Sequence, residues 1–276
     1  MPSDFSPDLP FVGAAMNVAD LDHYRDWLLA GQRDLELQDF CDPAAFDDLD
    51  GLVAHARSRL DGYTGRLGIH GAFYDLPLAA RDPEIGKVVQ HRLAQDLDAA
   101  EALGATHIVI HSPFSTWDHN NLPAYPDGEQ HVFERCNANM AAAVKRAESA
   151  GICFVIENIE DKDPAARVRL AKAFNSPAVK VSIDTGHAHY AHGSTGAPPV
   201  DYYVRAAGTE LMHIHLQDAD GHADRHWPPG KGTVNWHAVF AALKATGATP
   251  RLILELADVS RIMEGADWLV AEGLVR

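Results

Sequence analysis

The sequence has few cysteines, few basic residues and no long apolar run. Its three cysteines, Cys41, Cys136 and Cys153, form no CxxC pair, which argues against a disulfide framework and predicts a reducing, cytoplasmic setting. No apolar run approaches the ~18 residues that a membrane-spanning helix needs. Residues 1–10 lack a basic segment followed by an apolar one, so we expect no targeting segment and no membrane partner.

Positive charge is also scarce. Lys and Arg total 23 against 39 Asp and Glu, giving a formal net charge of −16. An acidic chain binds phosphate backbones poorly, which counts against nucleic acid as a partner, although a basic patch can exist on an acidic protein. Bound divalent cations would offset part of this charge locally.

The chain is long enough and apolar enough for one large core. It has 276 residues, of which 46% are hydrophobic. An α/β barrel occupies about 250 residues as one unit, so we expect a single domain over residues 1–276. The sequence leaves homo-oligomerisation open.

Short β-rich apolar segments alternate with helical patterns along the whole chain. We expect strands at Phe11–Val18, Leu35–Phe40, Leu67–Phe73, His107–Phe114, Cys153–Ile159, Val179–Asp184, Leu211–Gln217 and Leu252–Leu256. We expect helices at Leu21–Ala30, Pro43–Leu60, Pro83–Leu103, Glu129–Ala150, Pro164–Phe174, Val200–Ala207, Trp236–Thr246 and Ser260–Glu272. Eightfold strand–helix alternation predicts an α/β fold, a (β/α)8 TIM barrel.

Six successive predicted strands each deliver a metal-ligand side chain at or near the C-terminal end. These residues are His70, His111, Glu157, Asp184 with His187, His215 and Glu255. In a barrel these ends share one mouth, where active sites lie. Carboxylates at the ends of buried strands repel one another, and no Lys or Arg accompanies them there. A divalent cation would supply the positive charge, and His with Asp or Glu is an ordinary ligand set for Zn, Mn, Co or Fe.

Two long segments follow strands at this mouth, at residues 115–128 and 218–233. The second contains Asp224 and His226, which could complete a further site with His187. Trp117, Tyr74 and Trp227 could form a platform for a sugar ring or a base, with packing at the rim as the alternative. Lys231 could meet an anionic substrate, with a solvated turn as the alternative.

Eight other histidines are expected to have structural roles. We place His213 behind His215 or inside the barrel, because the two side chains point to the same face of a strand. The remaining ones are interpreted as surface or packing residues: His23, His55, His91, His107, His119, His131 and His237.

The chain resembles the xylose isomerase-like TIM-barrel superfamily from Phe11 to about Trp268. The matching stretches are GIHGAFYDLP, IVIHSPF, VIENIED, IDTGHAH, HIHLQDADGHADRH followed by GKG, and LILEL. This superfamily includes sugar phosphate isomerase/epimerase-type proteins, ketose 3-epimerases, hydroxypyruvate isomerases and AP endonucleases of the endonuclease IV type. Two patterns of residue roles follow from the resemblance.

The epimerase pattern implies one metal, held at positions matching Glu157, Asp184, His215 and Glu255. The two glutamates would also move protons: one removes a proton next to a metal-polarised carbonyl, and the other returns a proton on the opposite face. The position matching His187 contacts the sugar oxygens.

The endonuclease IV pattern implies three zinc ions. The first would be held by His70, His111 and Glu157, and the third by His187, Asp224 and His226. The second would be held by the four residues of the epimerase pattern. The resemblance thus implies one to three divalent ions (Mn, Zn, Co, Mg or Fe).

The sequence departs from both patterns. Ketose 3-epimerases usually carry an Arg six residues after the strand-seven His, where this chain has Gly221. No basic loop suited to DNA is evident, and the segment LELQDF looks more like the sugar enzymes.

We expect a metal-dependent isomerase, epimerase or related lyase acting on a sugar, keto-sugar or polyol in carbohydrate metabolism. The alternatives are a zinc phosphodiesterase of AP endonuclease type, an oxidative or dehydrating metal enzyme, and a non-catalytic sugar-binding barrel.

Overall fold

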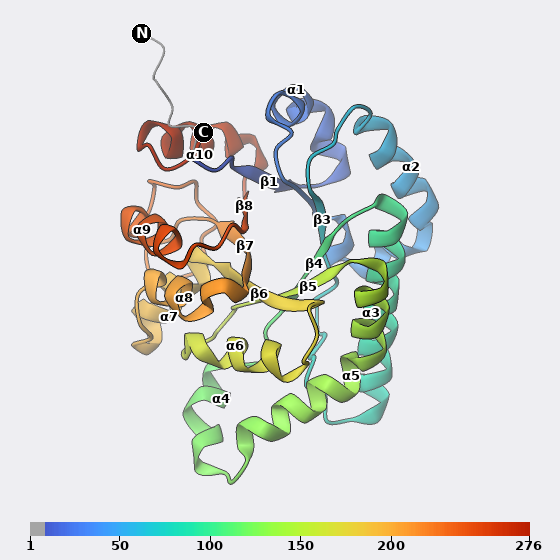
Figure 1. Ribbon diagram of the computed structural model, residues 1–276, viewed down its shortest axis with the longest axis vertical. Coiled ribbons are helices and arrows are strands. Elements are labelled where there is room, and N and C mark those ends of the chain that lie inside the picture. Colours follow the sequence, from blue (N-terminus) through green and yellow to red (C-terminus); the bar gives the residue numbers. More distant parts are fainter. Residues whose placement is uncertain (1–8) are drawn as a thin grey trace.

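A computed structural model describes residues 9–276, in which eight parallel strands close into a barrel surrounded by helices (Figure 1). The strands are β1 Gly13–Met16, β2 Leu35–Leu37, β3 Leu67–His70, β4 His107–His111, β5 Cys153–Glu157, β6 Val179–Asp184, β7 Leu211–Leu216 and β8 Arg251–Leu254. Each strand pairs with its neighbours in chain order, and β1 closes onto β8 with Gly13 opposite Ile253. The predicted (β/α)8 barrel is therefore confirmed.

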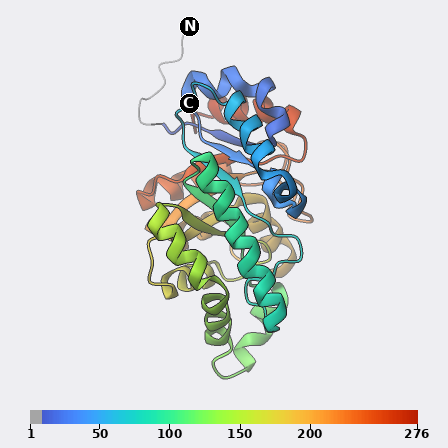
Figure 2. The same cartoon turned by 90° about the vertical axis from the view of Figure 1, so that its right-hand side faces the viewer.

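The helices cover the outside of the barrel. They are α1 Leu21–Gly31, α2 Leu49–Arg59, α3 Pro83–Leu103, α4 Thr116–Asn121, α5 Gly128–Ala150, α6 Pro164–Ala173, α7 Thr185–Thr195, α8 Val200–Ala207, α9 Trp236–Thr246 and α10 Ile262–Ala271. The long helices α3 and α5 lie side by side on the outer surface (Figure 2), joined by an ion pair between Arg146 and Glu101. Among the described residues, no helix is long and apolar enough to cross a membrane.

Helix α3 has the boundaries that its capping residues predict. The Asp82 side chain accepts a hydrogen bond from the Glu84 backbone N–H at 2.8 Å, and Pro83 occupies the first turn. Gly104 ends the helix with φ of 73°, in the left-handed region that glycine adopts without steric cost. One face of the helix, which includes Val89, Leu93 and Leu97, is fully buried against the barrel.

Two helices were not predicted. Helix α7 follows directly on β6, and the Asp184 side chain caps it by accepting from the His187 backbone N–H at 2.6 Å. His187 therefore lies on a helix and not on the end of the strand. The segment 115–128, predicted as a loop, contains α4 with a Ser115 capping box and a short 3₁₀ helix at Leu122–Ala124.

Candidate metal centre

The C-terminal mouth of the barrel gathers all the predicted metal ligands into three neighbouring groups, two of which share Glu157. Within each group the ligand atoms lie within 4.8 Å of one another. The groups are His70, His111 and Glu157; Glu157, Asp184, His215 and Glu255; and His187, Asp224 and His226. Strand register brings the members together, with His111 paired opposite Glu157 and Asp184 opposite His215.

The central group is built from four adjacent strand ends. His215 Nδ1 lies 3.2 Å from Glu157 Oε1 and 3.3 Å from Glu255 Oε2, so both glutamates meet at one nitrogen atom. Asp184 is fully buried, and its Oδ2 atom has no hydrogen-bond partner. A buried carboxylate oxygen without a partner is costly, and a metal ion would satisfy it.

The first group shares Glu157 with the central one. His70 Nε2 lies 3.5 Å and His111 Nε2 4.0 Å from Glu157 Oε2, another buried oxygen without a hydrogen-bond partner. The Phe73 ring stacks on the His111 ring at a centroid distance of 4.1 Å. Sequence reasoning gave Phe73 no role, because an aromatic residue after a strand also fits ordinary packing.

The third group depends on the segment after β7. Asp224 Oδ2 lies 3.2 Å from His187 Nε2, and Asp224 Oδ1 lies 3.1 Å from His226 Nε2. His226 has φ of 47°, an uncommon conformation for a residue with a side chain, and such residues concentrate at functional sites.

Backbone carbonyls orient three of these imidazoles. His70 Nδ1 lies 2.9 Å from the Gly71 carbonyl oxygen, His187 Nδ1 lies 2.9 Å from that of Asn158, and His226 Nδ1 lies 3.2 Å from that of Glu255. If each Nδ1–H donates to its carbonyl, each Nε2 is left facing its carboxylates. Ligand histidines are commonly oriented in this way.

The carboxylates and histidines at the mouth strongly influence one another's pKa values. Burial alone would raise the pKa of Glu157, but the His215 charge and hydrogen bonds from neighbouring histidines outweigh it and hold that pKa well below its usual range. Burial raises the pKa of Asp184 to about 6, although the charge of His187 opposes the rise. Burial would lower the pKa of His226, but contacts with Asp224 and Glu255 raise it to about 9. A divalent cation could supply the positive charge that these histidines otherwise carry.

Three buried polar residues support the mouth, although sequence reasoning assigned them no role. Gln217 Nε2 donates to Asp184 Oδ1 at 3.1 Å and to Asp224 Oδ1 at 2.9 Å, which connects the central and third groups. Asn158 exchanges hydrogen bonds with the Asp184 backbone. Glu36 Oε1 lies 2.8 Å from His215 Nε2 and leaves Nδ1 facing the glutamates.

The predicted substrate contacts have different surroundings. Tyr74 is 60% exposed beside Phe73, and Trp117 on α4 is 58% exposed. Such exposed aromatic side chains could still form a platform. Lys231 Nζ lies 2.7 Å from Glu264 Oε1, so its charge is already paired within the chain.

The chain is thus an α/β barrel whose C-terminal mouth gathers carboxylates and histidines that could hold metal ions. The family described as xylose isomerase-like TIM barrel matches residues 32–272, and the chain belongs to this family. An uncharacterized protein of Methanocaldococcus jannaschii is 22% identical over 195 residues, which cover 68% of this chain and 63% of that protein. The chain thus matches less than two thirds of that relative's length.

Several solved structures have the same fold. A Thermus thermophilus protein studied after soaking with ZnCl2 is 25% identical, with a TM-score of 0.73 over 95% of this chain and 98% of that chain. A D-psicose 3-epimerase of Clostridium cellulolyticum, solved with D-tagatose, is 18% identical, with a TM-score of 0.67 over 96% of this chain and 97% of that chain. The 3-keto-D-glucoside 4-epimerase of E. coli is 14% identical, with a TM-score of 0.67 over 95% and 98%. At the identities of the two epimerases the likeness concerns the fold.

Proposed function

We propose that this chain is a divalent-metal-dependent isomerase or epimerase that acts on a small sugar, keto-sugar or polyol. The observation that carries the proposal is the meeting of Glu157 and Glu255 at His215 Nδ1, at 3.2 and 3.3 Å. Two carboxylates held beside one cation site suit proton removal and return at a carbon next to a carbonyl. The sugar epimerases of the same fold add support.

Glu157, Asp184, His215 and Glu255 would hold the cation, whose bound form would polarise the substrate carbonyl. One glutamate takes the proton from the neighbouring carbon, and the other delivers a proton to the opposite face, so substrate and product have the same atoms. Glu36 keeps His215 oriented, and the hydrogen bond from Gln38 Nε2 positions Glu255. Exposed Tyr74 and Trp117 would contact the sugar ring.

Deuterium exchange tests the proposal. The purified protein with Mn²⁺ or Co²⁺ is incubated in D₂O with a panel of ketoses and keto-sugars, and NMR follows deuterium at the carbon next to the carbonyl. We expect exchange and a new isomer with at least one substrate. Glu157→Gln should lower the rate by at least about 100-fold, the scale of a lost general base.

Glu160→Gln is the matched control, since Glu160 is exposed and lies three residues further along the chain. It should keep the parent rate. Full activity of folded Glu157→Gln would overturn the proposed mechanism.

A second candidate, a zinc phosphodiesterase of endonuclease IV type, is favoured by a specific observation. Besides the central group, the structure forms two further groups. One joins His70 and His111 to Glu157, and the other consists of His187, Asp224 and His226. An epimerase with one metal does not need these additional residues. Cleavage of a phosphodiester by protein carrying about three zinc ions would favour this candidate, whereas about one Mn or Co ion with sugar turnover would favour the epimerase.

A further inference from the structure

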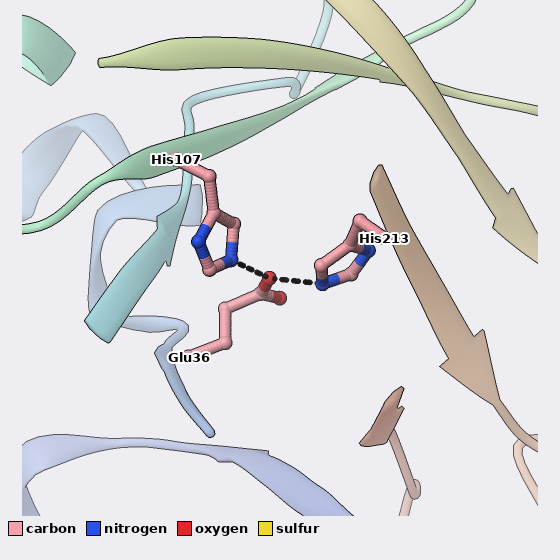
Figure 3. A group of neighbouring side chains, drawn as sticks. All are labelled: Glu36, His107 and His213. Carbon is pink, nitrogen blue, oxygen red and sulfur yellow. Dashed lines mark ion pairs between the residues drawn. The ribbon is translucent and has the colours of Figure 1, made fainter. Parts of the chain in front are cut away.

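A separate polar group lies below the mouth, inside the barrel. Glu36 on β2, His107 on β4 and His213 on β7 point toward one another from different sides (Figure 3). All three are 0% exposed. TIM-barrel interiors are normally filled by branched apolar side chains, so a carboxylate with two imidazoles at this depth needs a physical explanation.

The three ligand atoms have the spacing of a metal site. Glu36 Oε2 lies 3.4 Å from His107 Nε2 and 3.0 Å from His213 Nε2, and all three atoms lie within 4.8 Å of one another. Zinc binds imidazole nitrogen and carboxylate oxygen at about 2.0–2.1 Å, which places tetrahedral ligands about 3.3 Å apart. The observed spacing therefore fits one small cation at the centre.

The same atoms lack hydrogen bonds of acceptable geometry. Glu36 Oε2, His107 Nε2 and His213 Nε2 are all buried without a hydrogen-bond partner, although their distances are short. A buried polar atom that has lost its water and gained no partner destabilises the fold. A cation would satisfy all three at once. Burial lowers the pKa of His107 to about 3, which keeps its imidazole in the neutral, ligand form.

The surroundings accommodate and orient the two imidazoles. A Cβ atom at Gly68 would lie 2.0 Å from His107 Nε2, so the glycine in β3 provides the space for this ring. Ser182 Oγ lies 2.9 Å from His213 Nδ1 and can accept a hydrogen bond from Nδ1–H, which leaves Nε2 for a cation.

We propose that Glu36, His107 and His213 form a second, buried metal site that binds a zinc-type cation inside the barrel. This site is distinct from the groups at the mouth. Glu36 connects the two regions, because its Oε1 contacts His215 Nε2. Since the ligands are inaccessible to solvent, the ion must enter during folding and should leave only when the chain unfolds.

Metal retention tests this site. The protein is produced with zinc in the medium, treated with excess EDTA in the folded state, separated from the chelator, and analysed for metal per chain by mass spectrometry. The folded wild-type chain should retain about one zinc ion, which EDTA removes only after unfolding in guanidinium chloride. His107→Gln and His213→Gln should each lose the retained ion.

Two control variants should keep it: His237→Gln, which alters an exposed histidine, and Asp224→Asn, which alters the mouth. Glu36→Gln is avoided because it would disturb His215 as well. If the wild type retains no zinc, or if folded His107→Gln retains as much as the wild type, the proposal is wrong. The three residues would then form a network without a metal.

A measurement on the wild type avoids dependence on variants that fail to fold. Crystals of the EDTA-treated protein should show a zinc-edge anomalous peak between Glu36, His107 and His213. No peak at that position would overturn the proposal, whichever ions occupy the mouth.

Discussion

At the scale of single residues, Gln217 links the central group of the mouth to the third group through its side-chain amide. It donates to Asp184 and Asp224, and its Oε1 atom accepts from the His226 backbone N–H at 3.0 Å. Gln217→Leu keeps the volume but removes all three hydrogen bonds. We expect metal affinity at the third group to fall about 10–100-fold, measured by competition with a chelating dye.

Gln130→Leu is a suitable control for that experiment, since Gln130 is exposed on α5. It should bind metal as the parent does. Equal affinities in the parent and in Gln217→Leu would show that Asp224 and His226 need no support from Gln217.

Asp96 gives a prediction about pH and stability. Burial raises its pKa from 3.8 to about 7, and Oδ2 has no hydrogen-bond partner. The native state therefore binds a proton more tightly than the unfolded state does. The associated stability is fully present below about pH 4 and is lost as the pH rises through 7.

Asp96→Asn should remove this decline. At about 1.4 kcal/mol per pKa unit, the two units between pH 5 and the folded-state pKa of about 7 should give the variant a gain of roughly 2.5–3 kcal/mol over the parent between pH 5 and pH 8. Chemical unfolding at both pH values measures the difference. Asp98→Asn, an exposed position on the same helix, should leave the parent's pH dependence unchanged, and a parallel decline in Asp96→Asn would contradict the assignment.

At the scale of elements, the segment after β7 is held in place by one carboxylate. The fully buried Asp218 accepts hydrogen bonds from the backbone N–H groups of Ala219, Gly230 and Val234, and from Trp236 Nε1 at 3.0 Å. This segment carries Asp224 and His226.

Asp218→Ala should therefore loosen the segment. We expect a loss of about 3 kcal/mol or more in unfolding free energy, because four donors lose their acceptor and three of these hydrogen bonds are buried. Two measurements would detect the loosened segment: faster limited proteolysis between β7 and α9, and weaker metal binding at His187, Asp224 and His226. Asp220→Ala removes a partly exposed pair with Arg225 and an exposed hydrogen bond from the His222 backbone N–H, so it should cost much less stability than Asp218→Ala.

Elements with strong local patterns could be predicted from the sequence, and others could not. Helices α3, α8 and α9 have the predicted boundaries, because side-chain caps begin α3 and α9 and the apolar residues of α8 follow a regular helical spacing. Strands β3 and β4 end earlier than predicted, since apolar residues continue past them into the mouth. Helix α7 is rich in His and Gly and has no clear apolar stripe, so its pattern did not indicate a helix.

The residues of the candidate site likewise fall into those that the sequence predicts and those that it does not. Ligands at strand ends could be predicted, because parallel strands that close into a barrel share one mouth. The interior group could be predicted only for His213, which was expected behind His215 or inside the barrel and is fully buried. Glu36 lies 177 residues from His213 in the sequence and was given no role, and His107 was interpreted only as a surface or packing residue. Only the closure of the barrel and the tilt of its strands bring these three side chains together.

At the scale of the whole molecule, charge separates the two candidate functions. The net charge is −16, and many cations are already paired, including Arg146, Arg169 and Lys231. With 23 Lys and Arg against 39 Asp and Glu, the chain offers no net positive charge to neutralise a phosphate backbone. We expect no binding of a duplex with an abasic site in a mobility-shift assay at low salt, where phosphate contacts are strongest. Binding that weakens steeply with salt, together with strand cleavage, would instead favour the phosphodiesterase and show that the mouth forms a local positive surface once its metals are bound.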